Sequence, residues 1–387
     1  MVCYLAILSR NTMPGQGIAI GYDAKRAFFN RSGLGNFSRT LLNQLAQYQP
    51  DLGLHLFTPK LPEEPIFPGS ELMNVHAPVR KKAGWRTIGM VRDLEDQSVD
   101  IYHGLSHELP KGIQRLGIPT VVSMHDVIFR RYPDHYPMVD RLTYESKWQH
   151  SCRRATMLVA ISEATKRDLM TYYDVPEERV KVIYQSVARR FREVTTQTDH
   201  KAVREKYDLP EEYLLFVGSL TVRKNLLTVL KALSSLSRST RPPLVVVGQG
   251  KSYQRQMGAF LHRSGLSEEV FFRPDMQDED LPALYGGALA LLYPSLYEGF
   301  GLPVVEGLSQ RTPVITSHVS AMPEAAGPGG ILVDPLNSSE IAAQIERLAG
   351  DSLLRESMAQ QGQTYIAKFD PKVIAGKWAE LYRSLLS

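Results

Sequence analysis

The sequence predicts an α/β protein of two domains, each built on a parallel sheet. Short apolar runs alternate with amphipathic stretches along the chain, as strands and helices do in parallel sheets. A length of 387 residues favours two domains. The polar stretch Ser186 to Lys201 suits a linker. We therefore expect one domain over residues 1–190 and a second over residues 191–369.

The composition narrows the class of protein. The chain has 43% hydrophobic residues and a net charge of +4 from 45 basic and 41 acidic side chains, so it does not indicate a nucleic-acid partner. Its two cysteines form no disulfide or metal pattern, and no apolar run reaches the length of about 20 residues of a membrane span. The stretch from Met1 to Gly17 lacks the basic start of a signal peptide. We expect a loosely attached leader and a cytoplasmic location.

The elements of the first domain follow from apolar runs and capping residues. The segment from Ala24 to Ser32 is expected to be a loop, and Ser162 is expected to cap a helix. Helices are predicted from Gly33 onwards, over residues 141–154 and after Ser162. Strands are predicted over residues 17–22, 54–58, 72–76, 100–103, 119–126, 156–162 and 180–184.

The second domain shows the same alternation. Helices are predicted after Asn225, after Pro303, over residues 338–348 and over residues 371–386. Strands are predicted over residues 213–217, 243–248, 270–273, 288–293, 312–317 and 331–335.

The stretch from Tyr293 to Glu306 carries the strongest chemical signal. A buried strand ends in a glycine turn, and a helix begins near Pro303, since proline suits the first helical position. The free amides of such a helix start, expected from Leu302 to Val305, carry about half a positive charge, so a phosphate group fits there. Gly299 and Gly301 let the backbone approach a ligand closely.

Two carboxylates flank this phosphate position. Glu298 precedes the turn, and Glu306 lies about one turn inside the helix. Because carboxylates bind hydroxyl groups well, the expected ligand has sugars on both sides of a phosphate, as a nucleotide diphosphate sugar does. The alternative is a parallel-sheet crossover with acids on its solvated rim.

The motif around these two acids resembles the paired-glutamate motif of the retaining glycosyltransferases of family 4, which have the GT-B fold of two facing Rossmann-like domains. The resemblance extends over the sequence EGFGLPVVEGLSQRTPVITS. It implies that Glu306 binds the ribose of the donor and that Glu298 lies beside the transferred sugar. It also implies that the first domain binds the acceptor, that the second domain binds the nucleotide-sugar donor, and that the closing helix at residues 370–387 crosses back onto the first domain.

A second loop carries two adjacent cations after the strand at residues 213–217. Arg223 offers a flat fork to phosphate oxygens and Lys224 a compact charge; the alternative is a pair of solvated surface cations. The resemblance implies that both neutralise the leaving diphosphate, and that the segment at Arg273 meets the nucleotide base. The expected donor-binding residues are Gly33, Gly35, Gly218, Arg223, Lys224, Arg273, Gly299, Phe300, Gly301, Leu302 and Glu306.

Two candidates lie in the first domain. Gly33 and Gly35 open a helix but make a poor dinucleotide fingerprint, because Ser38 replaces the third glycine. The resemblance implies that this glycine loop meets the donor phosphates or the acceptor. His125 ends a predicted strand, where side chains point to a ligand, and the resemblance implies that it faces the donor sugar. His103 is a weaker candidate of the same kind, and a lone histidine can also simply cap or pack.

Two further motifs have structural interpretations. Asp278 and Asp280 match an Asp-x-Asp metal motif but suit the acidic first turn of a helix. We therefore expect no metal and no cofactor. The basic run Arg80–Lys82, with Arg86 and Arg92 after it, would suit an anionic membrane surface or a solvated helix face.

Together these features predict a retaining glycosyltransferase. Catalysis is assigned to Glu298, His125, Arg223 and Lys224. The resemblance to bacterial polysaccharide mannosyltransferases favours GDP-mannose as donor and a glycan or glycolipid as acceptor, with peripheral contact at the inner face of the membrane. Alternatives are a UDP-sugar donor, a sugar-nucleotide epimerase or an NAD-dependent oxidoreductase. The oligomeric state does not follow from the sequence.

Overall fold

The structure, a computed structural model, describes residues 17–30, 33–61, 67, 69–78 and 84–387. The predicted leader before Gly17 and the basic run Arg80–Lys82 therefore lie outside the described residues. The chain divides into two compact units. The first unit comprises Met1–Ser123, Arg154–Met157 and Ala375–Ser387, and the second comprises Met124–Arg153 and Leu158–Ile374.

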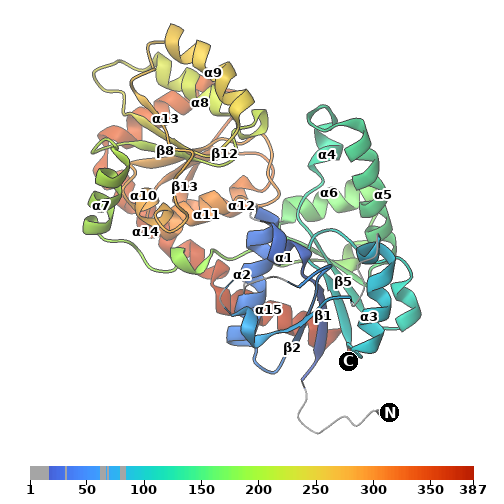
Figure 1. Cartoon of the computed structure of the whole chain (residues 1–387). Coiled ribbons are helices and arrows are strands. Elements are labelled where there is room, and N and C mark those ends of the chain that lie inside the picture. Colours follow the sequence, from blue (N-terminus) through green and yellow to red (C-terminus); the bar gives the residue numbers. More distant parts are fainter. Residues whose placement is uncertain (1–16, 31–32, 62–66, 68, 79–83) are drawn as a thin grey trace, which may run out of the picture. The chain divides into compact units, whose positions relative to one another are not determined.

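Within the described residues, the strands form two parallel sheets of seven and six strands (Figure 1). The first sheet has the order β3-β2-β1-β4-β5-β6-β7 and the second the order β10-β9-β8-β11-β12-β13. The strands are β1 Ala19–Asp23, β2 Gly53–Phe57, β3 Asn74–His76, β4 Ile101–Gly104, β5 Thr120–Met124, β6 Met157–Ala160, β7 Val180–Val182, β8 Leu214–Val217, β9 Leu244–Val247, β10 Val270–Phe272, β11 Ala290–Tyr293, β12 Val314–Ser317 and β13 Gly330–Val333.

Helices connect the strands and cover the sheets, as expected for parallel pairing. In the second unit, α8, α9 and α13 supply apolar side chains to the same core as the strands. The helices are α1 Lys25–Phe29, α2 Gly33–Tyr48, α3 Met90–Asp96, α4 Ile128–Arg131, α5 Met138–Arg154, α6 Glu163–Tyr173, α7 Gln197–Tyr207, α8 Leu226–Ser235, α9 Lys251–Arg263, α10 Leu281–Gly286, α11 Leu302–Ser309, α12 Met322–Ala326, α13 Ser338–Gly350, α14 Ser352–Tyr365 and α15 Pro371–Ser384. Among the described residues, no helix is both long and apolar enough to cross a membrane.

Local sequence signals explain where several helices begin. The Ser162 hydroxyl accepts the amide of Thr165 at 3.0 Å, which confirms this serine as the cap of α6. Pro303 lies in the first turn of α11, as its fixed φ angle favours. The loop predicted after Asp23 is wrong, because the structure has the short helix α1 there, with Phe28 buried. Burial of that ring stabilises a helical turn that no periodic pattern signals.

The order of each sheet reverses at one point. In the first sheet this point lies between β1 and β4, and in the second between β8 and β11. The loops that follow these two strands run in opposite directions. The carboxyl ends of the two strands therefore border a crevice, and ligands of parallel α/β proteins bind in such a crevice. Each sheet therefore has one preferred place for a binding site.

The weaker candidate His103 has a structural role. It lies inside β4 and is fully buried. One ring nitrogen lies 2.8 Å from the Tyr382 hydroxyl and the other 2.8 Å from the Ser123 hydroxyl, and its ring packs against Trp378 of α15. These contacts attach the end of the chain to the first unit.

Candidate active site

The loop after β8 is fixed at the switch point of the second sheet. Gly218 has a φ angle of 142°, which favours glycine, and a 3-10 turn spans Val222–Lys224. The side-chain Nδ2 of Asn225 donates to the carbonyl of Pro294 at 3.0 Å and to that of Pro335 at 2.6 Å. These bonds hold the loop against the ends of β11 and β13.

The loop brings two cations to one carboxylate oxygen. Oε1 of Glu298 lies 2.6 Å from Nη1 of Arg223 and 2.7 Å from Nζ of Lys224. The Tyr293 hydroxyl donates to the same oxygen at 3.3 Å, and Lys224 lies over the Tyr293 ring at 4.7 Å from its centroid. We call these four residues the Glu298 cluster. Its formal charge is +1, which suits an anionic ligand.

The electrostatics of the Glu298 cluster favour the ionised carboxylate. Burial alone would raise the pKa of Glu298, but the charges of Lys224 and Arg223 outweigh this effect and lower that pKa to about 2. Burial lowers the pKa of Lys224, and the carboxylate of Glu298 opposes this shift. Glu298 is therefore an anion already held where two cations meet.

The glycine turn after Glu298 allows no side chain at two positions. A Cβ atom on Gly299 would lie 1.9 Å from the backbone oxygen of His125. Gly301 has a φ angle of 111°, and a Cβ atom there would lie 2.4 Å from Met322. Glycine is thus required at position 299 by a close backbone contact and at position 301 by its positive φ angle.

The start of α11 offers fewer amides than the sequence suggests. The carbonyl of Gly301 accepts from the amides of Val304 at 2.9 Å and Val305 at 3.4 Å, and Pro303 has no amide hydrogen. The prediction of free amides from Leu302 to Val305 therefore has to be corrected. Only the amides that precede Pro303 remain for a ligand.

The second glutamate is placed one turn into α11. Glu306 accepts from the Tyr285 hydroxyl at 3.1 Å, and burial raises its pKa. The charge of Arg190 acts in the opposite direction. The side chain is held in one position, as a residue that recognises hydroxyl groups should be.

His125 and Asp126 follow β5 and lie close to the Glu298 cluster. The Thr165 hydroxyl lies 3.3 Å from the carbonyl of His125 and 3.2 Å from that of Gly299, so it links the two segments. Asp126 is near enough to Arg223 for that charge to lower its pKa, although burial has the larger effect and raises it. The structure thus brings His125 beside the glycine turn.

Three further residues predicted to bind the donor are not part of the Glu298 cluster. Gly33 and Gly35 lie in the first turn of α2 in the first unit. The guanidinium of Arg273 donates to the backbone carbonyls of Tyr207, Phe272 and Asp208. Its side chain therefore stabilises the local chain, and contact with a base would involve the backbone.

The side chain of Phe300 is also committed to packing. It is 3% exposed and lies 5.9 Å from the Tyr184 ring and 5.4 Å from the Phe369 ring, measured between centroids. This packing fixes the glycine turn in place. Leu302 is the first residue of α11 and is only partly buried.

Sequence reasoning missed two residues of this site, Tyr293 and Asn225. Tyr293 is the last residue of β11, and a residue at the carboxyl end of a parallel strand is a candidate by position alone. Asn225 has a positive φ angle of 65°, a conformation that asparagine tolerates. Its two carbonyl partners are distant in sequence and leave no local signal.

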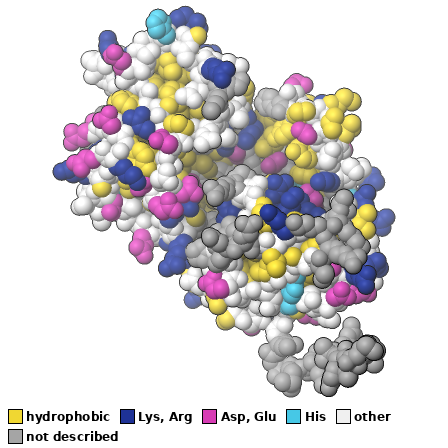
Figure 2. All heavy atoms as spheres, in the orientation of Figure 1, with side chains coloured by type: hydrophobic (Ala, Val, Ile, Leu, Met, Phe, Trp, Pro, Cys, Tyr) yellow, Lys and Arg dark blue, Asp and Glu magenta, His cyan; other side chains and the backbone are white. Residues whose placement is uncertain are grey.

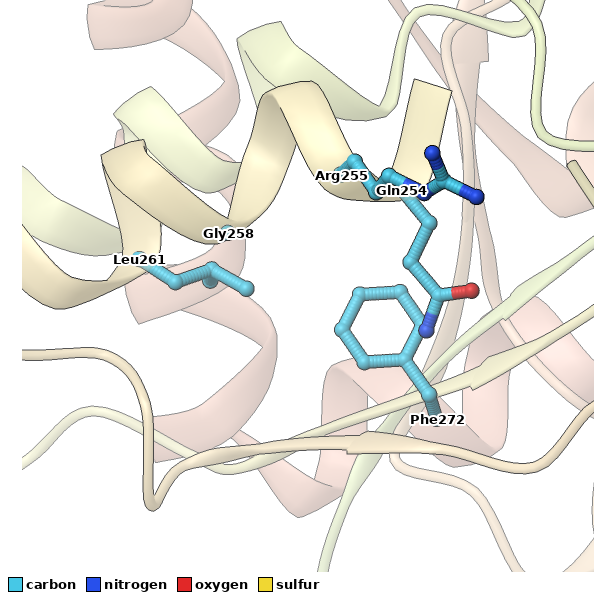
Figure 3. Close-up of a pocket in the computed structure, with 5 residues that line it drawn as sticks. All are labelled: Gln254, Arg255, Gly258, Leu261 and Phe272. Carbon is cyan, nitrogen blue, oxygen red and sulfur yellow. The ribbon is translucent and has the colours of Figure 1, made fainter. Parts of the chain in front are cut away.

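Two other features lie apart from the Glu298 cluster. A pocket between α9 and β10 is lined by Gln254, Arg255, Gly258, Leu261 and Phe272 (Figure 3), none of them a predicted site residue. Asp280 directly precedes α10 and binds Lys206 and the Tyr207 hydroxyl, each at 2.6 Å.

Two family models together match most of the chain. One, described as glycosyl transferases group 1, matches residues 198–365, and the other, described as Glycosyltransferase Family 4, matches residues 31–189. O-antigen chain mannosyltransferase B of Escherichia coli is 29% identical over 283 residues, which make up 72% of each protein. Alpha-D-kanosaminyltransferase of Streptomyces kanamyceticus is 26% identical over 70% of this chain and 72% of that protein.

Solved structures share the fold. A glycosyltransferase from Rickettsia africae is 17% identical with a TM-score of 0.75, and the match covers 96% of this chain and 99% of that one. HepE of Anabaena, solved in complex with UDP, is 18% identical with a TM-score of 0.74 over 95% and 100% of the two chains. The protein belongs to the family 4 glycosyltransferases and has the GT-B fold. It is therefore an enzyme that transfers a sugar.

Proposed function

We propose that the protein is a retaining mannosyltransferase that moves mannose from GDP-mannose to a hydroxyl group of a glycan or glycolipid. The observation that carries the proposal is the Glu298 cluster, in which Arg223 and Lys224 meet one carboxylate at the switch point of the second sheet. A departing diphosphate needs fixed positive charge, and cations held in place by the fold supply it without reorganisation during the reaction.

The proposed reaction breaks the bond between the anomeric carbon and the diphosphate oxygen. The acceptor oxygen bonds to the anomeric carbon on the same face, and its proton passes to the leaving phosphate oxygen. Arg223, Lys224 and the amides before Pro303 stabilise the charge that develops on that phosphate. This step needs no protein base and no metal ion.

Acidic side chains orient the donor in this proposal. Glu306 binds the ribose, and Glu298 lies beside the transferred sugar with His125. A covalent intermediate would require a carboxylate beneath the anomeric carbon. Glu298 is a poor nucleophile for that route, because both cations already bind one of its oxygens.

The choice of mannose rests on the relatives. O-antigen chain mannosyltransferase B of Escherichia coli and the O-antigen chain mannosyltransferase RfbU of Salmonella typhimurium, which is 26% identical, both carry mannose in their names. Their names also support a polysaccharide acceptor. A cytoplasmic location follows from this assignment, since nucleotide sugars are supplied there.

The proposal includes peripheral contact with the membrane that carries the acceptor. Hydrophobic side chains gather on the surface over α4 and α5 (Figure 2). Met138, Val139 and Leu142 of α5 are exposed there. Leu142→Asp should weaken binding to anionic liposomes in a sedimentation assay. Leu353→Asp, at an exposed leucine of α14, is the matched control, and equal binding of both variants would refute the contact.

The donor assignment is tested by measuring nucleotide release. The protein is incubated with GDP-mannose, UDP-glucose or ADP-glucose, with and without glycan acceptors, and the anomeric configuration of the product is read by NMR. We expect release from GDP-mannose and an α-linked product. Nucleotide release from UDP-glucose alone would show that the donor is a UDP-sugar and not GDP-mannose. Thermal stabilisation by NAD alone, without release from any donor, would overturn the transferase proposal.

A further inference from the structure

The segment predicted as a linker is bound to α11. Gln310 directly follows α11 and is 2% exposed. Its side-chain Nε2 donates to the carbonyl of Phe191 at 3.2 Å and to that of Glu193 at 2.9 Å. These two bonds fix the 3-10 turn Arg189–Phe191 beside the helix that carries Glu306.

The same turn supports the residue that holds Glu306. Phe191 is fully buried, and its ring meets the Tyr285 ring edge-on, with 5.7 Å between the centroids and an angle of 78° between the planes. The Tyr285 hydroxyl donates to Oε2 of Glu306 at 3.1 Å. Glu306 keeps partial exposure. Its carboxylate is therefore fixed in place and still open to a ligand.

Arg190 brings a positive charge to this turn. Its guanidinium carbon lies over the Phe191 ring, 5.2 Å from the centroid. Its Nη2 lies 3.8 Å from Oδ2 of Asp278, and its side chain is 30% exposed. Its Nε is buried and has no hydrogen-bond partner among the described residues. An ion pair of 3.8 Å is longer than a hydrogen bond, so the charge of Arg190 also acts on other groups.

Arg86 shows how an arginine with a structural role differs. It lies in the helical turn Trp85–Gly89. Its Nε lies 2.5 Å from Asp23, and its Nη1 lies 2.8 Å from Glu108. This finding corrects the sequence interpretation of Arg86 as part of a basic outer face. Two close carboxylates neutralise Arg86, whereas within the described part of the chain the carboxylate paired with Arg190 is 3.8 Å away.

The charge of Arg190 acts on Glu306. Burial raises the pKa of Glu306, and the charge of Arg190 is the largest effect that opposes this rise. The Tyr285 hydrogen bond and the charge of Lys224 also lower this pKa, and the charge of Asp278 raises it. An ionised carboxylate accepts hydrogen bonds at both oxygens, whereas a protonated carboxyl uses one oxygen as a donor. Arg190 thus favours the form of Glu306 that accepts from both hydroxyl groups of a ribose.

We infer that Arg190 is a positioning residue for the nucleoside of the donor and that it acts through Glu306. The inference rests on the proposed function, in which Glu306 binds the ribose of a nucleotide diphosphate sugar. It adds to the donor site a residue of the predicted linker. Because GDP and UDP share the ribose, it holds for either donor. The alternative is that Arg190 only pairs with Asp278 and supports the fold.

The pH dependence of nucleotide binding tests the inference. Isothermal titration calorimetry gives the dissociation constants of GDP, UDP and inorganic pyrophosphate between about pH 5 and 8, for the wild type, Arg190→Gln and Arg190→Lys. Ionised Glu306 binds the ribose, so nucleotide affinity should fall as the pH falls through its pKa. Loss of the Arg190 charge raises that pKa further, so the fall should begin at a higher pH in Arg190→Gln. At the acid end, the dissociation constant of GDP should be about fivefold higher than in the wild type. Arg190→Lys should keep the wild-type profile.

Asp278→Asn separates the electrostatic role from a structural one. The charge of Asp278 raises the pKa of Glu306, so its removal should move the fall in affinity to a lower pH, opposite to Arg190→Gln. Loss of a merely structural ion pair would have the same effect in both variants. Pyrophosphate shares the titrating diphosphate but lacks the ribose, so its profile should be equal in all these proteins. Arg311→Gln is the matched control, because it breaks an exposed ion pair with Glu356 close to the end of α11.

The outcomes separate this inference from the proposed function. Equal nucleotide profiles of the wild type and Arg190→Gln would overturn the inference, and so would an equal shift of the pyrophosphate profile. Shifts of the same sign in Arg190→Gln and Asp278→Asn would also overturn it. In each of these cases the wild type still binds nucleotide, so the donor site stands. A wild type that binds neither GDP nor UDP would overturn both the inference and the proposed donor.

Discussion

Glu298→Gln should make the enzyme bind nucleoside diphosphate more tightly while it loses turnover. In the wild type, one oxygen of Glu298 lies 2.6 Å from Arg223 and 2.7 Å from Lys224. A diphosphate has to share both cations with this carboxylate. A pKa lowered from 4.5 to about 2 corresponds to about 3 kcal/mol of interaction in favour of the ionised form. Without the competing carboxylate charge, both cations can interact fully with the diphosphate, so part of this interaction energy adds to the free energy of ligand binding.

We expect the dissociation constant of GDP to fall about tenfold, since phosphate oxygens replace only part of the carboxylate contact. Isothermal titration calorimetry with GDP and with inorganic pyrophosphate measures the effect, because pyrophosphate lacks the ribose and the base. Glu306→Gln is the control. It should weaken GDP binding and leave pyrophosphate binding unchanged. Weaker binding of both ligands to Glu298→Gln would refute the competition.

Three further predictions concern the same unit. Charge removal at both Arg223 and Lys224 should lower kcat by about 100-fold or more in a nucleotide-release assay, and unchanged turnover would exclude cationic stabilisation of the leaving group. Gly299→Ala should lower the free energy of unfolding by about 3 kcal/mol in urea, because the new Cβ atom meets a backbone oxygen at 1.9 Å; Gly258→Ala, with nothing within 4 Å, should not, and equal stability of the two variants would contradict the close contact. Burial raises the pKa of Asp168 from 3.8 to about 6, so the protonated carboxyl stabilises the folded state below pH 3.8 and this stabilisation is lost as the pH rises through 6. The melting temperature of the wild type should therefore fall over this pH range because of Asp168, and Asp168→Asn should lack that fall. The same pH profile in both proteins would argue against the shift.

Short-range patterns determined much of the fold. The alternation of apolar runs and amphipathic stretches predicted two parallel sheets, and Ser162 and Pro303 marked the starts of α6 and α11. Such signals work because a cap or a helical period depends on residues a few positions apart. The spacing of Glu298 and Glu306 around a glycine turn likewise placed the candidate site after β11.

Only the tertiary structure decided which charges meet. Two cations share one oxygen of Glu298 because Asn225 fixes the loop after β8 to the ends of two other strands. Asp23, Arg86 and Glu108 are far apart in the sequence and converge because the sheet order reverses between β1 and β4. Crossover connections set that order, and no local pattern records it. The sequence by itself determined the elements and the chemistry available, and the topology decided which side chains act together.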